Sequence, residues 1–139
     1  MTRLRTERLT LRPASLKDVD ALHAVFSNPR AMRYWDTLPH SQVTQTRQFV
    51  EAMMHTPFAQ GEDFVAEYAG RVIGKAGFWR LPEIGYILHP DCWGQGLGSE
   101  AVAAVADYGF KTRGLSEITA DVDPRNQASS GTENPFFLR

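Results

Sequence analysis

A glycine-rich turn reads Trp93-Gly94-Gln95-Gly96-Leu97-Gly98-Ser99-Glu100 and joins two segments of different hydrophobic period. The run 83–88 before it is typical of a strand, and apolar residues over 97–113 recur at helical spacing. A helix N-terminus leaves about four backbone N–H groups without intrahelical partners, and the helix dipole favours negative charge there. Glycines let those groups approach a ligand closely. The turn therefore predicts a phosphate site, with a tight turn that needs glycine for geometry alone as the alternative.

Two familiar phosphate fingerprints do not fit this turn. A P-loop needs Gly-Lys followed by Ser or Thr, and that combination does not occur in the chain. A dinucleotide site needs G-x-G-x-x-G in an opening βαβ unit, whereas Ser99 holds the sixth position from Gly94 and the turn comes late. Because no Lys or Arg occurs over 91–110, the sequence predicts that main-chain groups hold the phosphate, without neighbouring ion pairs.

The remaining segments predict one layered domain of the α/β (α+β) class. Alternation indicates further strands at 8–12, 64–68, 72–78 and 118–122, with a glycine-containing hairpin turn at 69–71. Helical spacing indicates helices between Ser15 and Asn28 and over 41–55. The first of these begins with Ser15 as N-cap and Asp18 three residues later, and Leu16 is expected on its buried face.

Composition and charge exclude several classes of protein. The 139 residues suit one domain, and 15 basic against 16 acidic residues, with no long basic run, argue against nucleic-acid binding. No stretch approaches ~20 apolar residues and the N-terminus lacks a signal core, so we expect no membrane segment and a cytoplasmic location. The single cysteine, Cys92, and the scattered histidines predict no metal site.

Several motifs together resemble the GNAT superfamily of N-acetyltransferases. Gly96-Leu97-Gly98 after Trp93 looks like the pyrophosphate loop Q/R-x-x-G-x-G/A, with Trp93 in the Q/R place. That departure is typical of the ribosomal-protein N-terminal (alanine and serine) acetyltransferase-like branch. Further landmarks are Thr6-Glu7-Arg8-Leu9-Thr10-Leu11-Arg12-Pro13, Glu83-Ile84-Gly85-Tyr86 and Asp123-Pro124-Arg125-Asn126-Gln127-Ala128-Ser129. The resemblance runs over 6–129 and implies a GNAT-like domain at 1–129, with a mixed, mostly antiparallel twisted sheet flanked by helices.

The resemblance implies acetyl-CoA as cosubstrate, held between two splayed parallel strands. Backbone groups of Tyr86, Ile87 and Leu88 would face the pantetheine arm and the thioester carbonyl, and Asn126 matches the family asparagine near that arm. The pyrophosphate would contact the backbone of the whole turn, that is Trp93, Gly94, Gln95, Gly96, Leu97, Gly98 and Ser99.

The implied reaction is direct acetyl transfer to a primary amine, either a protein N-terminus or a small amine. The amine must lose a proton before it attacks. Glu83 stands where this branch often carries a glutamate facing the amine, and it could take that proton directly or through a water; a solvated charge at the strand start is the alternative. Tyr34 and Trp35 lie in a loop that shapes the acceptor site in this branch, with core packing as their alternative role.

The resemblance stops after Ser129, where the family continues with an amphipathic helix and two more strands. Residues 130–139 instead predict an irregular tail. A shortened reading frame, a partner chain that supplies the lost layer, and a non-catalytic acyl-CoA-binding or interaction module are the competing explanations. Unpaired strand edges and the Phe136-Phe137-Leu138 tail favour self-association, for example as a homodimer.

Overall fold

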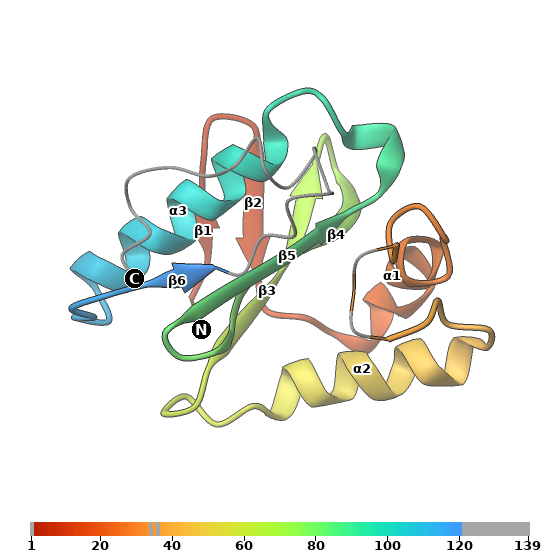
Figure 1. The fold of residues 1–139 in the computed structure, drawn as a ribbon, viewed down its shortest axis with the longest axis horizontal. Helices are drawn as coiled ribbons and strands as arrows, with labels where there is room; N and C mark the ends of the chain where they lie inside the picture. The colour runs from red at the N-terminus through yellow and green to blue at the C-terminus, as the bar shows by residue number, and fades with distance from the viewer. Residues whose placement is uncertain (1, 34, 36, 121–139) are drawn as a thin grey trace.

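The computed structural model describes residues 2–33, 35 and 37–120, which form a mixed sheet with helices on both faces (Figure 1). The strands are β1 (Leu4–Arg5), β2 (Leu9–Arg12), β3 (Glu62–Tyr68), β4 (Arg71–Arg80), β5 (Glu83–Leu88) and β6 (Thr119–Ala120). The helices are α1 (Val19–Phe26), α2 (Val43–His55) and α3 (Leu97–Lys111), with short 3₁₀ turns η1 (Leu16–Asp18) and η2 (Pro90–Cys92). The α/β class is confirmed. The expected domain end at 129 and the tail 130–139 lie outside the described residues.

The six strands of the described residues lie in the sheet in chain order. Neighbouring strands are antiparallel from β1 to β5. Short turns join β1 to β2 and β3 to β4 to β5, whereas the chain between β2 and β3 forms α1 and α2. β3, β4 and β5 therefore form an antiparallel meander, and the hairpin turn expected at 69–71 is confirmed between β3 and β4. β6 pairs with β5 in parallel, through Glu83 with Thr119 and Ile84 with Ala120, after the chain has crossed over through α3. The sheet therefore presents a parallel pair of strands beside the helix that follows the glycine turn.

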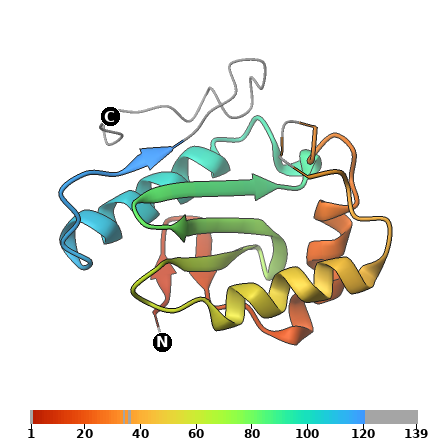
Figure 2. The same cartoon turned by 60° about the horizontal axis from the view of Figure 1, so that its bottom comes forward.

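The core is divided in two by the sheet, because both of its faces are covered (Figure 2). Leu9, Leu11 and Phe64 face α3, whereas Val65 and Ile87 face α1 and α2. β4 lies in the middle of the meander and is buried over six consecutive residues, from Ile73 to Phe78. Successive residues of a strand therefore contact helices on opposite faces of the sheet. On β5 the even-numbered residues from Ile84 to Leu88 face α3, and Ile87 faces α1 and α2.

One local expectation is wrong, and the structure adds one strand that the sequence did not predict. Leu16 is 42% exposed, because it lies in the 3₁₀ turn η1, whose three-residue period does not continue the buried face of α1. β1 was not expected at all, since two residues carry no readable alternation; it forms because Leu4 and Arg5 pair with Leu11 and Thr10 of β2.

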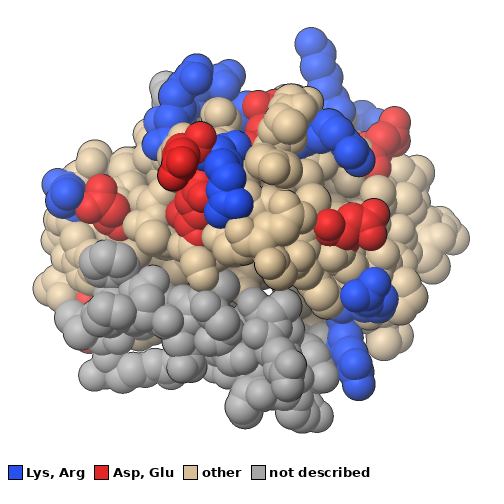
Figure 3. All heavy atoms as spheres, turned by 90° about the horizontal axis from the view of Figure 1, so that it is seen from above, with Lys and Arg blue, Asp and Glu red and all other residues tan. Residues whose placement is uncertain are grey.

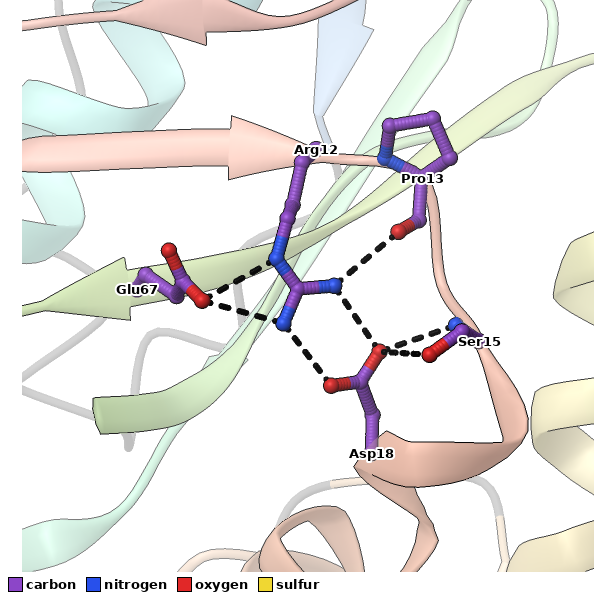
Figure 4. A network of polar contacts seen from close by, with 5 residues as sticks. All are labelled: Arg12, Pro13, Ser15, Asp18 and Glu67. Carbon is purple, nitrogen blue, oxygen red and sulfur yellow. Dashed lines mark hydrogen bonds and ion pairs between the residues drawn. The ribbon is translucent and has the colours of Figure 1, made fainter. Parts of the chain in front are cut away.

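Arg12 ties the second strand to the start of the first helix (Figure 4). Its guanidinium bonds to both oxygens of Asp18, at 2.8 and 2.9 Å, and to the Glu67 carboxylate of β3. Asp18 also accepts the Ser15 backbone N–H at 2.8 Å, which is one half of the expected capping box. Burial alone would raise the pKa of the Asp18 carboxyl, but the bonds from Arg12 and Ser15 outweigh it and hold that pKa below its usual value.

Candidate cofactor and acceptor site

The glycine turn lies between β5 and α3, where the sequence predicted it. After η2 the chain passes through Gly94, with φ +77°, and Gly96, with φ +80°, which is the N-cap of α3. Both positions require the left-handed conformation that glycine adopts without strain. No atom lies within 4 Å of the place a Cβ would take on Gly94, so the outer side of the turn is open. The first intrahelical bond of α3 runs from Glu100 N–H to Gly96 O, which leaves the earlier N–H groups outside the helical ladder.

The side chains of the turn have unequal roles. Leu97 is almost completely buried and belongs to the core under α3, so only its backbone can face a ligand. The Gln95 side chain turns back to the Asp91 carbonyl at 3.5 Å. Gly98 and Ser99 form the first turn of α3. A ligand at this turn would therefore meet mainly backbone, and the main-chain phosphate site stays a prediction.

Arg8 is a cation at the turn that the absence of Lys and Arg over 91–110 does not predict. Its Nη1 donates to the Gln95 carbonyl at 2.9 Å, and its Nη2 lies 3.4 Å from the Cβ position of Gly96. Its Nε donates to Glu100 at 2.8 Å. This contact joins residues more than 80 positions apart in the sequence, because the turn between β1 and β2 places Arg8 beside the start of α3. The residues next to the turn in the sequence therefore give no sign of it. The segment 6–13, which contains Arg8, is one of the motifs that resemble the GNAT superfamily, but the resemblance assigned Arg8 no role at the turn.

Trp93 holds the end of β5 against the turn. Its indole N–H donates to the Leu88 carbonyl at 3.0 Å, and the guanidinium of Arg30 lies 5.4 Å from its ring centroid. The family pattern has a glutamine or arginine at this place, and here the indole supplies a single donor that is used inside the protein. Arg30 adds a second cation beside the turn, from the loop that follows α1.

On the face of the molecule seen from above Figure 1, the described residues carry cationic and anionic side chains interspersed, without a continuous basic patch among them (Figure 3). The described residues of this face therefore present no broad field of one charge sign to a ligand.

The backbone of β5 alternates between its two neighbours. The Ile87 carbonyl points toward β4, where it comes within 2.0 Å of the Cβ position of Gly74, a contact that only glycine allows. Successive residues of a strand direct their backbone groups to opposite edges, so those of Tyr86 and Leu88 point toward the β6 side. The Leu88 carbonyl, which Trp93 contacts, is one of these groups.

Glu83 begins β5 and lies on the same face of the sheet as Gly85 and Ile87, the face that α1 and α2 cover. Its side chain is about one-fifth exposed, and Arg80 Nη2 donates to its Oε1 at 3.2 Å. Gly85 leaves room beside it for the Trp79 indole, whose Cδ1 lies 3.1 Å from the Gly85 Cβ position. Glu83 is therefore a half-buried carboxylate at the parallel end of β5, on the side away from α3.

Trp35 lies on that same face, while Tyr34 falls outside the described residues. The Trp35 ring meets the edge of Phe26 at 5.7 Å and lies 6.4 Å from Phe49, so it closes the α1–α2 core. Beneath it Lys75 Nζ lies 5.7 Å from the ring centroids of both Trp35 and Phe49. Trp35 thus packs against the core of this face, and its part in an acceptor site stays a prediction.

A buried ion pair on this face was missed by the sequence reading. Lys75 Nζ donates to Asp63 Oδ2 at 2.6 Å, and both side chains are more than nine-tenths buried. The second oxygen, Oδ1, has no hydrogen-bond partner among the described residues and lies against Gly77. The sequence signal was a Lys within the alternating run 72–78, but only the pairing of β3 with β4 reveals its partner.

Cys92 and the histidines, the remaining candidates for reactive or metal-binding groups, have structural contacts in the described part of the chain. Burial raises the pKa of the Cys92 thiol, which favours its neutral form. His23 and His40 both bond to Thr46, and no group of three potential metal ligands occurs in the described part of the chain. No helix among those residues is both long and apolar enough to cross a membrane. Asn126 lies outside them.

Comparisons with known proteins agree with this arrangement. Over 139 residues the chain is 36% identical to the protein named uncharacterized N-acetyltransferase p20 of Bacillus licheniformis, covering 93% of this chain and 78% of that protein. It is 32% identical to the uncharacterized N-acetyltransferase YoaA of Bacillus subtilis, covering 91% and 77%. A GNAT-family acetyltransferase structure from Bacillus anthracis superposes with a TM-score of 0.84 at 28% identity, covering 94% of this chain and 80% of that one.

A structure of the RimL ribosomal L7/L12 acetyltransferase in complex with coenzyme A has a TM-score of 0.79 at 21% identity, a likeness of fold over 94% of this chain and 80% of that one. The family described as acetyltransferase (GNAT) domain matches residues 8–132, which is most of the chain. The chain therefore belongs to the GNAT family of acetyltransferases.

Proposed function

We propose that this acetyltransferase moves the acetyl group of acetyl-CoA directly to a primary amine, with the diphosphate of the cosubstrate on the glycine turn and Glu83 as the base. The observation that carries the proposal is the open turn at the N-terminus of α3, which follows the C-terminal end of β5, the strand whose first residue is Glu83. The turn fits a diphosphate, because open space and helix N–H groups meet there and the cation of Arg30 lies over the Trp93 ring beside it.

Acetyl-CoA supplies an activated acyl group as a thioester. In the proposed transfer a bond forms between the amine nitrogen and the acyl carbon, the carbon–sulfur bond breaks, and coenzyme A leaves. The backbone groups of Tyr86 and Leu88 point to the side where the thioester arm would lie, with the Ile87 carbonyl turned to β4. Trp93 holds the Leu88 carbonyl in place beside it.

Glu83 would accept the proton that the attacking amine loses. An α-amino group or a lysine-like amine is mostly protonated at neutral pH, so a base must act before attack. Glu83 lies on the opposite face of the sheet from α3, on the side of Trp35 and the loop after α1. This separation lets the cosubstrate and the amine reach the sheet from different layers. We propose Trp35 as part of the acceptor wall on this side.

The first test is a calorimetric titration with acetyl-CoA. The proposal expects a micromolar dissociation constant, which corresponds to about −8 kcal/mol. Gly94→Asp should weaken binding about tenfold or more, because its carboxylate would face the diphosphate. Gly70→Asp is a matched control: Gly70 has the same φ of +77° and the same open surroundings, but it lies in the turn between β3 and β4. Equal effects of the two substitutions would remove the turn as the phosphate site.

The second test addresses the base. Glu83→Gln should lower kcat for acetyl transfer about 100-fold or more while the dissociation constant of acetyl-CoA stays near that of the wild type. Glu51→Gln, on the exposed side of α2, serves as control. An unchanged kcat in Glu83→Gln would contradict the proposed base. A wild-type chain that binds acetyl-CoA but acetylates no amine would instead support the non-catalytic binding module.

The acceptor itself stays open to a screen. RimL-type acetyltransferases are one of several groups of structural neighbours, so peptides with free N-termini and small primary amines should both be offered. Self-association as a homodimer and a cytoplasmic location remain predictions, which light scattering and cell fractionation can test.

A further inference from the structure

Arg8 connects the hairpin of β1 and β2 to α3 and to the glycine turn, through its backbone N–H and through Nε and Nη1 of its guanidinium. Its backbone N–H donates to Glu100 Oε2 and its Nε to Glu100 Oε1, each at 2.8 Å. Its Nη1 donates to the Gln95 carbonyl at 2.9 Å. The Thr6 hydroxyl completes the network by donating to Glu100 Oε2. One side chain thus holds an acidic group of α3 and a carbonyl of the turn at the same time.

Glu100 is an anion in the first turn of the helix whose N-terminus would receive a diphosphate. Side chains of a helix incline toward its N-terminus, so an unrestrained Glu100 carboxylate would lie near the turn. The N–H groups and the helix dipole that attract a phosphate would attract this carboxylate as well. In the structure Glu100 accepts hydrogen bonds from the Thr6 hydroxyl and from the backbone N–H and Nε of Arg8, so the hairpin holds its carboxylate.

The Gln95 carbonyl matters because it fixes the next peptide N–H. In a planar trans peptide the C=O of one residue and the N–H of the next point in opposite directions. Since Arg8 Nη1 holds the Gln95 carbonyl on the hairpin side, the N–H of Gly96 is turned to the other side. Gly96 has φ +80°, and glycine adopts positive and negative φ values about equally readily. The hydrogen bond from Arg8 to the Gln95 carbonyl therefore favours the observed orientation of this peptide.

We infer that Arg8 is a positioning residue for the phosphate-binding turn: it withholds the Glu100 carboxylate from the N-terminus of α3 and orients the Gln95–Gly96 peptide toward the diphosphate. The inference rests on the proposed function, since it assigns the turn to acetyl-CoA. It differs from a packing role in one respect. Most of the loss caused by removal of Arg8 comes from the released anion, so removal of that anion restores binding.

The test is a double-mutant cycle on acetyl-CoA binding. Arg8→Gln should raise the dissociation constant of acetyl-CoA about tenfold or more, because the carboxylate of Glu100 is no longer neutralised. Glu100→Gln should bind at least as tightly as the wild type. The Arg8→Gln/Glu100→Gln chain should return to within about threefold of the wild type. Arg8→Lys should rescue only in part, because an ammonium cannot contact Glu100 and the Gln95 carbonyl as a fork does.

Steady-state kinetics separate positioning from general damage. In Arg8→Gln the KM for acetyl-CoA should rise, while the KM for the amine and kcat at saturation change less than about twofold. The matched control is Lys111→Gln/Asp107→Asn, which removes an exposed ion pair from the last turns of the same helix. It should leave the dissociation constant of acetyl-CoA unchanged. Thermal unfolding of every variant verifies that the chain is folded.

The outcomes separate the inference from the function on which it rests. A wild-type chain that binds no acetyl-CoA ends the proposed function, and the inference falls with it. A wild-type chain that binds, together with Arg8→Gln that binds equally well, leaves the proposed function standing and overturns the inference. An Arg8→Gln/Glu100→Gln chain as weak as Arg8→Gln overturns it too, because the effect would then not pass through Glu100.

Discussion

Lys75 is a charged side chain that the fold takes out of water. Its ammonium pairs with Asp63 at 2.6 Å and lies between the rings of Trp35 and Phe49, each 5.7 Å away. Desolvation makes such a pair a weak source of net stability, but a single partner left alone is strongly unfavourable. The two charges are therefore retained or lost together.

Substitution of one partner should accordingly cost more than substitution of both. Lys75→Met leaves the Asp63 carboxylate buried without a cation, and should lower the free energy of unfolding by about 3–5 kcal/mol. Asp63→Asn/Lys75→Met leaves no charge, and should regain most of that loss. Urea unfolding measures both. Lys111→Met/Asp107→Asn, an exposed pair, should change the free energy of unfolding by less than about 1 kcal/mol. A Lys75→Met loss as small as that of the exposed pair would contradict the coupling.

At the scale of elements, local periodicity predicted most of the fold. β5 has the predicted bounds, 83–88, and α2 and α3 differ from their predicted ranges only at their ends. The local pattern suffices because each of these segments has enough residues to show its period. β1 has two residues and owes its existence to its partner β2, so no local pattern could predict it. Leu16 was misplaced because a 3₁₀ turn precedes α1.

In the candidate site, too, the sequence predicts the features that are local and misses the contacts that depend on strand pairing. The glycine turn and the strand of Glu83 are contiguous in sequence, and the sequence places both. Arg8 at the turn and Asp63 under Lys75 depend on which strands pair, which a single sequence does not display. These charged residues therefore had no predicted role, whereas the fold buries Lys75 with Asp63 and brings Arg8 to the Gln95 carbonyl of the turn.

At the scale of the whole molecule, ionisable groups join elements that are distant in sequence. Thr46 of α2 bonds to Nδ1 of His23, at 2.8 Å, and to Nδ1 of His40, at 2.7 Å. A hydroxyl has one hydrogen, so it can donate to only one ring, and the other ring must donate to its oxygen. Burial, together with the neighbouring His23, lowers the pKa of His40 below its usual value. Folding therefore favours neutral His40.

This arrangement predicts a fall in stability with acid in two stages. The pKa of His40 is lower in the folded chain than the 6.5 of the unfolded one, so its contribution is complete above pH 6.5 and declines as the pH falls below it. The pKa values of Asp18 and Glu100 are also lowered, since bonds from Arg12, Arg8 and their neighbours outweigh burial. Their contributions are present above the unfolded values of 3.8 and 4.5, and decline only below them.

Urea unfolding between pH 8 and pH 3 should therefore show one decline of the free energy of unfolding that starts near pH 6.5 and a second that starts near pH 4.5. His40→Asn should remove the first decline and keep the second, because the two carboxylates are untouched. His55→Asn, at the exposed end of α2, is the control and should keep both. If His40→Asn and the wild type lost stability in parallel from pH 7 to pH 5, the contacts of His40 with Thr46 and His23 would not govern the first stage.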